Sequence, residues 1–260
     1  RDQPVTMQAY TVYEHPLNER IRTMLRLEHL FQRGAHFIKG QSDWDSRIFI
    51  DTLLDILDVF SRGDLKTELL KELDRSTGNL KGLLENPNVD HSRLSTILRA
   101  LEHLIENLHG LTAPPGQSLR NDAFITSIRQ RSSIPGGTCN FDLPIYHYWL
   151  EQDWKKREHD QKRWFSSLDP VRQAIELLLK MIRNSAQPRD IATDNGGYQQ
   201  QLEGSFPYQM IRVLLPSNSP YYAEISGSKH RFSLRFLKYQ KSTTQKAEET
   251  VHFKLACCGL

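Results

Sequence analysis

The stretch Arg129–Leu150, RQRSSIPGGTCNFDLPIYHYWL, is the least generic run of the chain and predicts where its helices are interrupted. Pro135-Gly136-Gly137 ends any helix arriving from residues 124–128, because proline blocks the helical backbone and glycine allows positive φ. Asp142-Leu143-Pro144 is typical of a new helix start, and a short extended piece is expected over residues 138–141.

Basic side chains flank this loop on both sides. Arg129 and Arg131 precede it, and His147 follows on the opening turns of the next helix. A tight glycine-marked loop between basic groups could grip an extended acidic segment. A structural turn with ordinary surface arginines explains the same pattern, and both interpretations stay open at this point.

Around this loop, apolar residues at helical spacing predict a helical part of the chain. The expected helices cover about residues 17–31, 43–61, 65–85, 90–108, 121–131 and 169–182, with one more starting at Pro144. The polar run 153–164, DWKKREHDQKRW, is expected to continue the helix that starts at Pro144 and to face solvent. Glu72 and Arg75, in the helix over residues 65–85, are expected to face solvent as well.

Three arginines upstream of the loop are candidates for binding. Arg22 and Arg26 stand one helical turn apart, where like charges repel unless something offsets them. Either Glu19 and Glu28 do so, or the two arginines face an anionic partner. Arg62 lies at an Arg-Gly-Asp corner between two antiparallel helices, where the three-residue match to an integrin ligand carries no weight.

Beyond Gln187-Pro188 the composition changes to strand-like runs, which are expected at residues 198–202, 209–215, 222–226, 231–239 and 250–256. In residues 231–239, Phe232, Leu234 and Phe236 alternate with polar residues, so the apolar side chains share one sheet face and the arginines the other. An N-terminal strand within residues 7–14 is expected to join this sheet. The predicted fold is therefore α+β, with a mainly antiparallel α-helical domain (17–186) and an antiparallel β-sheet domain (1–16 and 187–260).

Composition limits the function classes. The 260 residues are 25% charged and 38% hydrophobic, which is typical of a globular protein. We find neither a membrane-spanning apolar run nor a signal-peptide core, which favours a soluble cytoplasmic protein. The net charge is only +3, but residues 208–254 hold eight Lys/Arg against three Asp/Glu. The positive excess therefore lies in the C-terminal part.

Sequence signatures of common chemistry are missing. The chain has no Walker A motif, no GxGxxG, no HExxH and no GxSxG. Its three cysteines show no CxxC spacing, and its ten histidines show no metal-ligand spacing. Asp142 and His147 could form an acid/base pair, but no nucleophile stands beside them. We therefore expect neither an enzyme nor a metal or other cofactor.

Several long motifs together resemble the ZapD family, also called YacF, over about residues 10–258. They are EHPLNE at Glu14–Glu19, LLDILDVFSRGDLKTELLKELDR at Leu53–Arg75, RQRxSIPGGxCxFDLPxxHxWL at Arg129–Leu150, SGxKxRFxxRF at Ser226–Phe236 and LACC at Leu255–Cys258. The resemblance implies a dimeric, cofactor-free division factor at mid-cell. Such a factor binds the C-terminal tail of the tubulin-like GTPase FtsZ, bundles its filaments and stabilises the Z ring.

The family's basic pocket would correspond here to Arg22, Arg26, Arg62, His147, Lys229, Arg231 and Arg235, with Arg129 and Arg131 nearby. One departure is Ala123, where the family pattern can carry a basic residue, and Arg120 is a helical neighbour that could substitute. The competing interpretation is nucleic-acid binding through the basic face of the C-terminal sheet. The family reading expects no membrane and no nucleic-acid partner.

Overall fold

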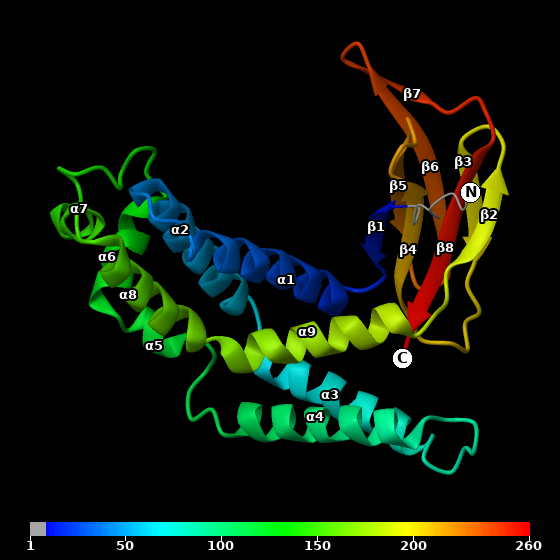
Figure 1. Cartoon of the computed structure of the whole chain (residues 1–260), viewed down its shortest axis with the longest axis horizontal. Helices are drawn as coiled ribbons and strands as arrows, with labels where there is room; N and C mark the ends of the chain where they lie inside the picture. The colour runs from blue at the N-terminus through cyan, green and yellow to red at the C-terminus, as the bar shows by residue number, and fades with distance from the viewer. Residues whose placement is uncertain (1–8) are drawn as a thin grey trace, which may run out of the picture. The chain divides into compact units, whose positions relative to one another are not determined.

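The computed structural model of the protein describes residues 9–260 (Figure 1). It confirms the α+β class, with helices followed by antiparallel strands. The chain divides into two compact units. The helical unit is Thr23–Leu178, and the sheet unit comprises Leu179–Leu260 with the N-terminal segment that ends at Arg22. This division falls inside two helices, and domain limits at residues 16/17 and 186/187 stay a prediction.

Most of the longer helices of the described chain begin at a side-chain cap. The helix bounds are α1 Glu19–Phe37, α2 Asp43–Phe60, α3 Leu65–Lys81, α4 His91–His109, α5 Gln117–Arg120, α6 Ala123–Ser132, α7 Pro144–Leu150, α8 Trp154–Ser166 and α9 Asp169–Asn184. The short helices α5 and α7 begin at Gly116 and Leu143 without such a cap. Ser42 Oγ accepts from the Asp45 amide and the Asp45 carboxylate accepts from the Ser42 amide, which is a complete capping box for α2. Asp64, Asp90 and Asp122 are the N-caps of α3, α4 and α6, where each carboxylate accepts from a backbone amide of the first turn.

The loop between α6 and α7 is a series of turns, so the extended piece expected over residues 138–141 is wrong. Backbone bonds run from Gly137 N to Ile134 O and from Cys139 N to Gly136 O. Gly136 has a positive φ of 72°, which glycine adopts freely. A Cβ on Gly137 would lie 2.6 Å from Arg131 O, so only glycine allows this close approach.

Two expected solvated faces are wrong in part. α7 ends at Leu150 and α8 starts separately at Trp154, and within α8 Arg157 and Gln161 are buried. Glu72 of α3 is fully buried as well. Mixed charge along a helix suggests exposure, but packing against distant elements decides which of those side chains meets water.

The sheet unit contains two four-stranded sheets (Figure 1). Its strands are β1 Tyr10–Pro16, β2 Arg189–Thr193, β3 Gly197–Gln201, β4 Tyr208–Pro216, β5 Tyr222–Gly227, β6 Arg231–Gln240, β7 Thr243–Lys246 and β8 Val251–Gly259. One sheet has the order β1-β4-β8-β2, and the other has β3-β6-β5 with β7 paired to β6. The N-terminal strand therefore joins a sheet as expected, although residues 7 and 8 of the expected strand lie outside the described residues. The strands β2 and β7 were not predicted.

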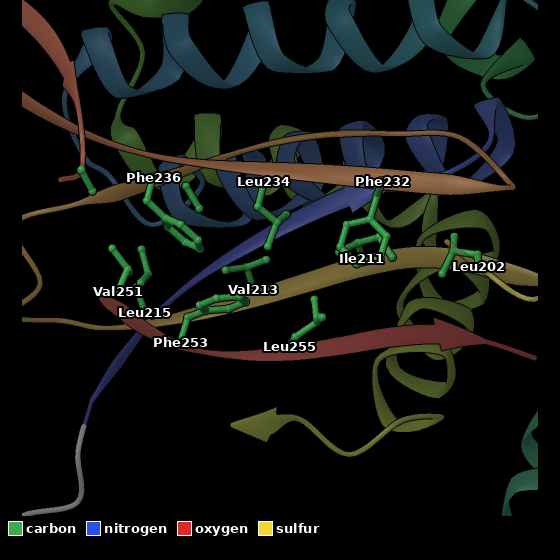
Figure 2. Packing of buried hydrophobic residues seen from close by; sticks show 12 residues of the cluster. Leu202, Ile211, Val213, Leu215, Phe232, Leu234, Phe236, Val251, Phe253 and Leu255 are labelled. Carbon is green, nitrogen blue, oxygen red and sulfur yellow. The ribbon is translucent and has the colours of Figure 1, made fainter. Parts of the chain in front are cut away.

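A shared apolar core holds the two sheets together (Figure 2). Phe232, Leu234 and Phe236 of β6 are at most 2% exposed, which confirms the alternation read from residues 231–239. They pack with side chains of β4 and β8, among them Val213 and Phe253. Because successive residues of a strand point to opposite faces, this packing turns Arg231 and Arg235 outward.

A charged triad links three elements of the sheet unit. The Glu14 carboxylate on β1 accepts from Arg183 of α9 at 2.8 Å and from Arg212 of β4 at 2.9 Å. Burial raises the pKa of Glu14, but the hydrogen bonds and charges of the two arginines outweigh burial and hold that pKa below its ordinary value. The carboxylate is thus part of the folded architecture.

Candidate functional site

In the helical unit, three of the predicted cations lie at the ends of α2 and α6. Arg62 follows α2 in the turn that leads to α3, and Arg129 and Arg131 occupy the last turn of α6. Arg129 Nη2 binds Asp58 Oδ1 at 2.7 Å. Asp58 lies four residues before Arg62, so this contact holds the Arg129 guanidinium near the end of α2. The structure therefore brings together residues that are about 70 positions apart in sequence.

Arg120 does not fill the position left by Ala123. Its Nη1 donates to Pro115 O and its Nη2 to Leu57 O, each at 3.1 Å. Burial first, and then the charge of Arg129, lowers the pKa of Arg120, whereas Asp58 raises it. Its donors serve the packing of the α5 turn against α2, so this guanidinium is not free for a ligand.

In the sheet unit, Arg231 lines a hollow of about 540 Å³ above β3, β5 and β6. Gln199, Gln201, Ser226 and Ser233 line it as well, so its walls are rich in amides and hydroxyls. The register explains the grouping, because Ser233 on β6 pairs with Gln199 on one side and Ser226 on the other. Lys229 lies in the turn between β5 and β6, next to this hollow.

Arg22 reaches the same end of the sheet unit. Burial lowers the pKa of His15, a hydrogen bond from its ring to the Gly227 backbone raises it, and the charge of Arg22 lowers it further, so that the pKa lies below its ordinary value. Gly227 is itself a lining residue of the hollow that contains Arg231. His15 thus lies beside the hollow that contains Arg231, whereas Arg22 is not among the residues that line it.

His147 lies on the outer side of α7, where it is 3.9 Å from the Glu151 carboxylate. The inner side of α7 is fixed by aromatic packing. Tyr146 and Trp149 stack with ring centroids 6.1 Å apart, and both contact Phe124 of α6. Trp149 Nε1 also donates to Asp160 of α8 at 3.1 Å. The outer residues of α7 are thus presented from a rigid support.

The predicted residues differ in how free they are to bind an anion. Arg22 pairs with Glu19 at 3.0 Å, Arg129 with Asp58, and Arg235 with Glu224 at 2.6 Å. Within residues 9–260 no ion pair or side-chain hydrogen bond engages the remaining five cations, which are Arg26, Arg62, Arg131, Lys229 and Arg231. All five are exposed.

Residues that sequence reasoning missed include Arg157 of α8 and the exposed aromatic residues Phe141 and Tyr148 beside His147. Arg157 was hidden within a charged run. Tyr148 could have been found from the sequence, because helical spacing places it on the side of the helix opposite Trp149 and Leu150. Phe141 lies in the loop before that helix.

Metal binding, thiol chemistry and membrane crossing can each be examined in the described part of the chain. Among residues 9–260, no group of three or more His, Cys, Asp and Glu side chains could hold a metal ion. Burial raises the pKa of the Cys258 thiol to about 11, so it stays protonated near neutrality. No helix in this range is long and apolar enough to cross a bilayer.

Fold and surface together define a two-unit α+β protein, in which each unit carries exposed cations of the predicted set. The profile of the ZapD family, described as a cell division protein, matches residues 25–235. A protein of Methylococcus capsulatus named cell division protein ZapD is 40% identical over 255 residues, covering 98% of this chain and all of the relative.

Two further relatives have the same name. The Enterobacter sp. protein is 40% identical over 253 residues, with 97% of this chain and all of the relative covered. The Coxiella burnetii protein is 38% identical over 259 residues, with 98% and 100% covered. The chain belongs to the ZapD family of cell division proteins, as its motifs predicted.

Proposed function

We propose that this protein is a non-enzymatic division factor that binds the C-terminal tail of FtsZ through its surface cations. It acts as a homodimer in the cytoplasm at mid-cell, where two sites per dimer cross-link and bundle FtsZ filaments and stabilise the Z ring. Membership of the ZapD family supports the role in division. The observation that carries the binding proposal is the set of cations that no carboxylate neutralises within residues 9–260.

Unpaired cations favour an anionic ligand for a physical reason. An acidic peptide that arrives at Arg231 need not displace an internal carboxylate, whereas at Arg235 it competes with Glu224. Guanidinium groups bind carboxylates with two parallel hydrogen bonds, so the contact is selective for the orientation of the carboxylate as well as for its charge. Each exposed pair contributes at most about 1 kcal/mol. Useful affinity therefore needs several contacts, and a dimer on a polymer adds avidity.

The nucleic-acid alternative receives less support from the sheet. Non-specific binding to single strands relies on aromatic side chains on which bases stack. On β6, Phe232 and Phe236 are buried in the core, and the outward face carries Arg231, Ser233 and Arg235, with Tyr239 as the exposed aromatic residue of this strand. A gel shift with random single-stranded DNA at physiological salt should show no stable complex, and a stable complex would favour the alternative.

The binding test titrates a labelled FtsZ C-terminal tail peptide with the full chain and follows fluorescence anisotropy. We expect saturable binding of the native peptide and none of a scrambled one. Arg231→Glu should weaken binding about tenfold or more, since it replaces an attraction by a repulsion at one contact. Arg99→Glu is the matched control, because Arg99 is equally exposed but lies on α4 outside the predicted set.

Cross-linking is tested separately. Sedimentation equilibrium of the full chain should give a dimer, and light scattering with polymerised FtsZ should report bundles. A chain that binds the peptide but stays monomeric and fails to bundle would retain the tail-binding part of the proposal and remove the cross-linking part. Equal affinity of the native and scrambled peptides would remove both.

A further inference from the structure

A second hollow, of about 480 Å³, lies on the outer side of α7. It is lined by Asn140, Phe141, Pro144, His147, Tyr148 and Glu151. Phe141 is 81% exposed and Tyr148 68%, and the adjacent Ile145 is 53% exposed. Large apolar side chains at such exposure are costly in water, so a cluster of three of them indicates a binding surface.

The cluster is built to stay in place. Pro144, His147, Tyr148 and Glu151 follow one another at helical spacing along the same side of α7. The opposite side of that helix is buried through Tyr146, Trp149 and Leu150. Because the helix cannot rotate without breaking this packing, its backbone is fixed before any ligand arrives, which removes one part of the entropic cost of binding.

The size of the cluster points to a short segment as its occupant. Aromatic side chains present about 150–250 Å² each, so these three residues expose on the order of 400 Å². A stable protein–protein interface takes about 800 Å² from each partner. The cluster is thus half of what a dimer would need, but it can cover one or two side chains of a peptide.

The charge of the lining narrows the chemistry further. Glu151 lines the hollow with its side chain 70% exposed and 3.9 Å from His147, and none of the six lining residues is a lysine or an arginine. A carboxylate beside an apolar wall complements a cation beside an apolar side chain. This differs from the polar hollow of the sheet unit, where Arg231 attracts an acidic group.

We propose that the α7 hollow binds a bulky apolar side chain of the partner's tail, next to a basic residue that pairs with Glu151. This inference rests on the proposed function and adds a second, oppositely charged contact to it. The partner would carry an acidic part for the free arginines and an apolar-basic part for α7. Recognition of both parts would make the chain selective for one tail among many acidic peptides.

The test measures anisotropy of the labelled FtsZ tail peptide with the full chain and three variants. Phe141→Ser/Tyr148→Ser should weaken binding by about ten- to a hundredfold, the loss expected when one large apolar side chain is no longer buried. Tyr239→Ser is the matched control, because Tyr239 is 69% exposed on β6. It should bind like the parent chain. Glu151→Lys should weaken binding, and a tail peptide in which one basic residue is replaced by glutamate should bind this variant more tightly than the native peptide does.

The outcomes separate the two proposals. If the parent chain binds and Arg231→Glu weakens binding while the α7 variants do not, the hollow is not part of the site and the proposed function stands. If the parent chain binds no tail peptide and no FtsZ polymer, both fail. If sedimentation shows that Phe141→Ser/Tyr148→Ser turns a dimer into a monomer, a second copy covers this surface and the inference is overturned.

Discussion

The buried guanidinium of Arg157 offers the sharpest test of how the helical unit holds α7 in place. Its donors bind Ser46 Oγ at 3.0 Å and the carbonyl oxygens of Leu150, Gln152 and Gln41 at 2.6 Å each. The side chain is 6% exposed. One residue thus joins the end of α7 and the start of α2 through a planar fork of donors.

Arg157→Met keeps most of the side-chain volume but removes every donor. Each buried carbonyl left without a partner costs about 1–3 kcal/mol. Part of that loss is offset, because the desolvation cost of a buried charge disappears as well. We expect the free energy of unfolding to fall by roughly 3 kcal/mol and Tm to fall by roughly 6–12 °C.

The measurement is urea and thermal unfolding followed by circular dichroism. The matched control is Arg163→Met on the same helix, whose side chain is 61% exposed, pairs with Asp160 and lies over the Trp164 ring. That variant should change stability by less than about 0.5 kcal/mol. A loss below about 1 kcal/mol in Arg157→Met would refute the view that this residue anchors α7. Weaker tail binding in Arg157→Met at temperatures where it is folded would link the anchor to function.

Three further predictions concern other parts of the molecule. Gly78→Ala should raise the free energy of unfolding by about 0.5–1 kcal/mol in urea titrations, because a Cβ there meets no atom within 4 Å and alanine favours the helix; a loss of stability would contradict this. The lowered pKa of Glu14 implies stability that is present above its unfolded pKa and is lost as the pH falls through the folded value, so acid unfolding of the parent chain should steepen below about pH 4.5. In Glu14→Gln that part of the pH dependence should disappear, and an identical acid transition in both would contradict the role of the triad. Bundling of FtsZ should fade as salt rises from low to about 0.5 M, since exposed charges are screened beyond about 8 Å already at physiological ionic strength; light scattering that is independent of salt would contradict an electrostatic site.

Local patterns predicted the parts of the fold that depend on neighbours in sequence. Alternation over residues 231–239 placed Phe232, Leu234 and Phe236 in the core, and burial confirms it. The glycine pair after Pro135 interrupted the helices where expected, because positive φ and close backbone approach are properties of those residues themselves. The same patterns failed at Arg157 and Glu72, whose burial depends on partners from other elements.

By itself the sequence determined the α+β class, the side chains of the core, the interrupted helix at residues 129–150 and the family. Each of these rests on periodicity, on backbone preferences or on long motifs, which are readable along the chain. Only the tertiary structure decided which cations are neutralised and which are free. Arg129 meets Asp58 across 71 positions, because folding brings charges together that no local spacing relates.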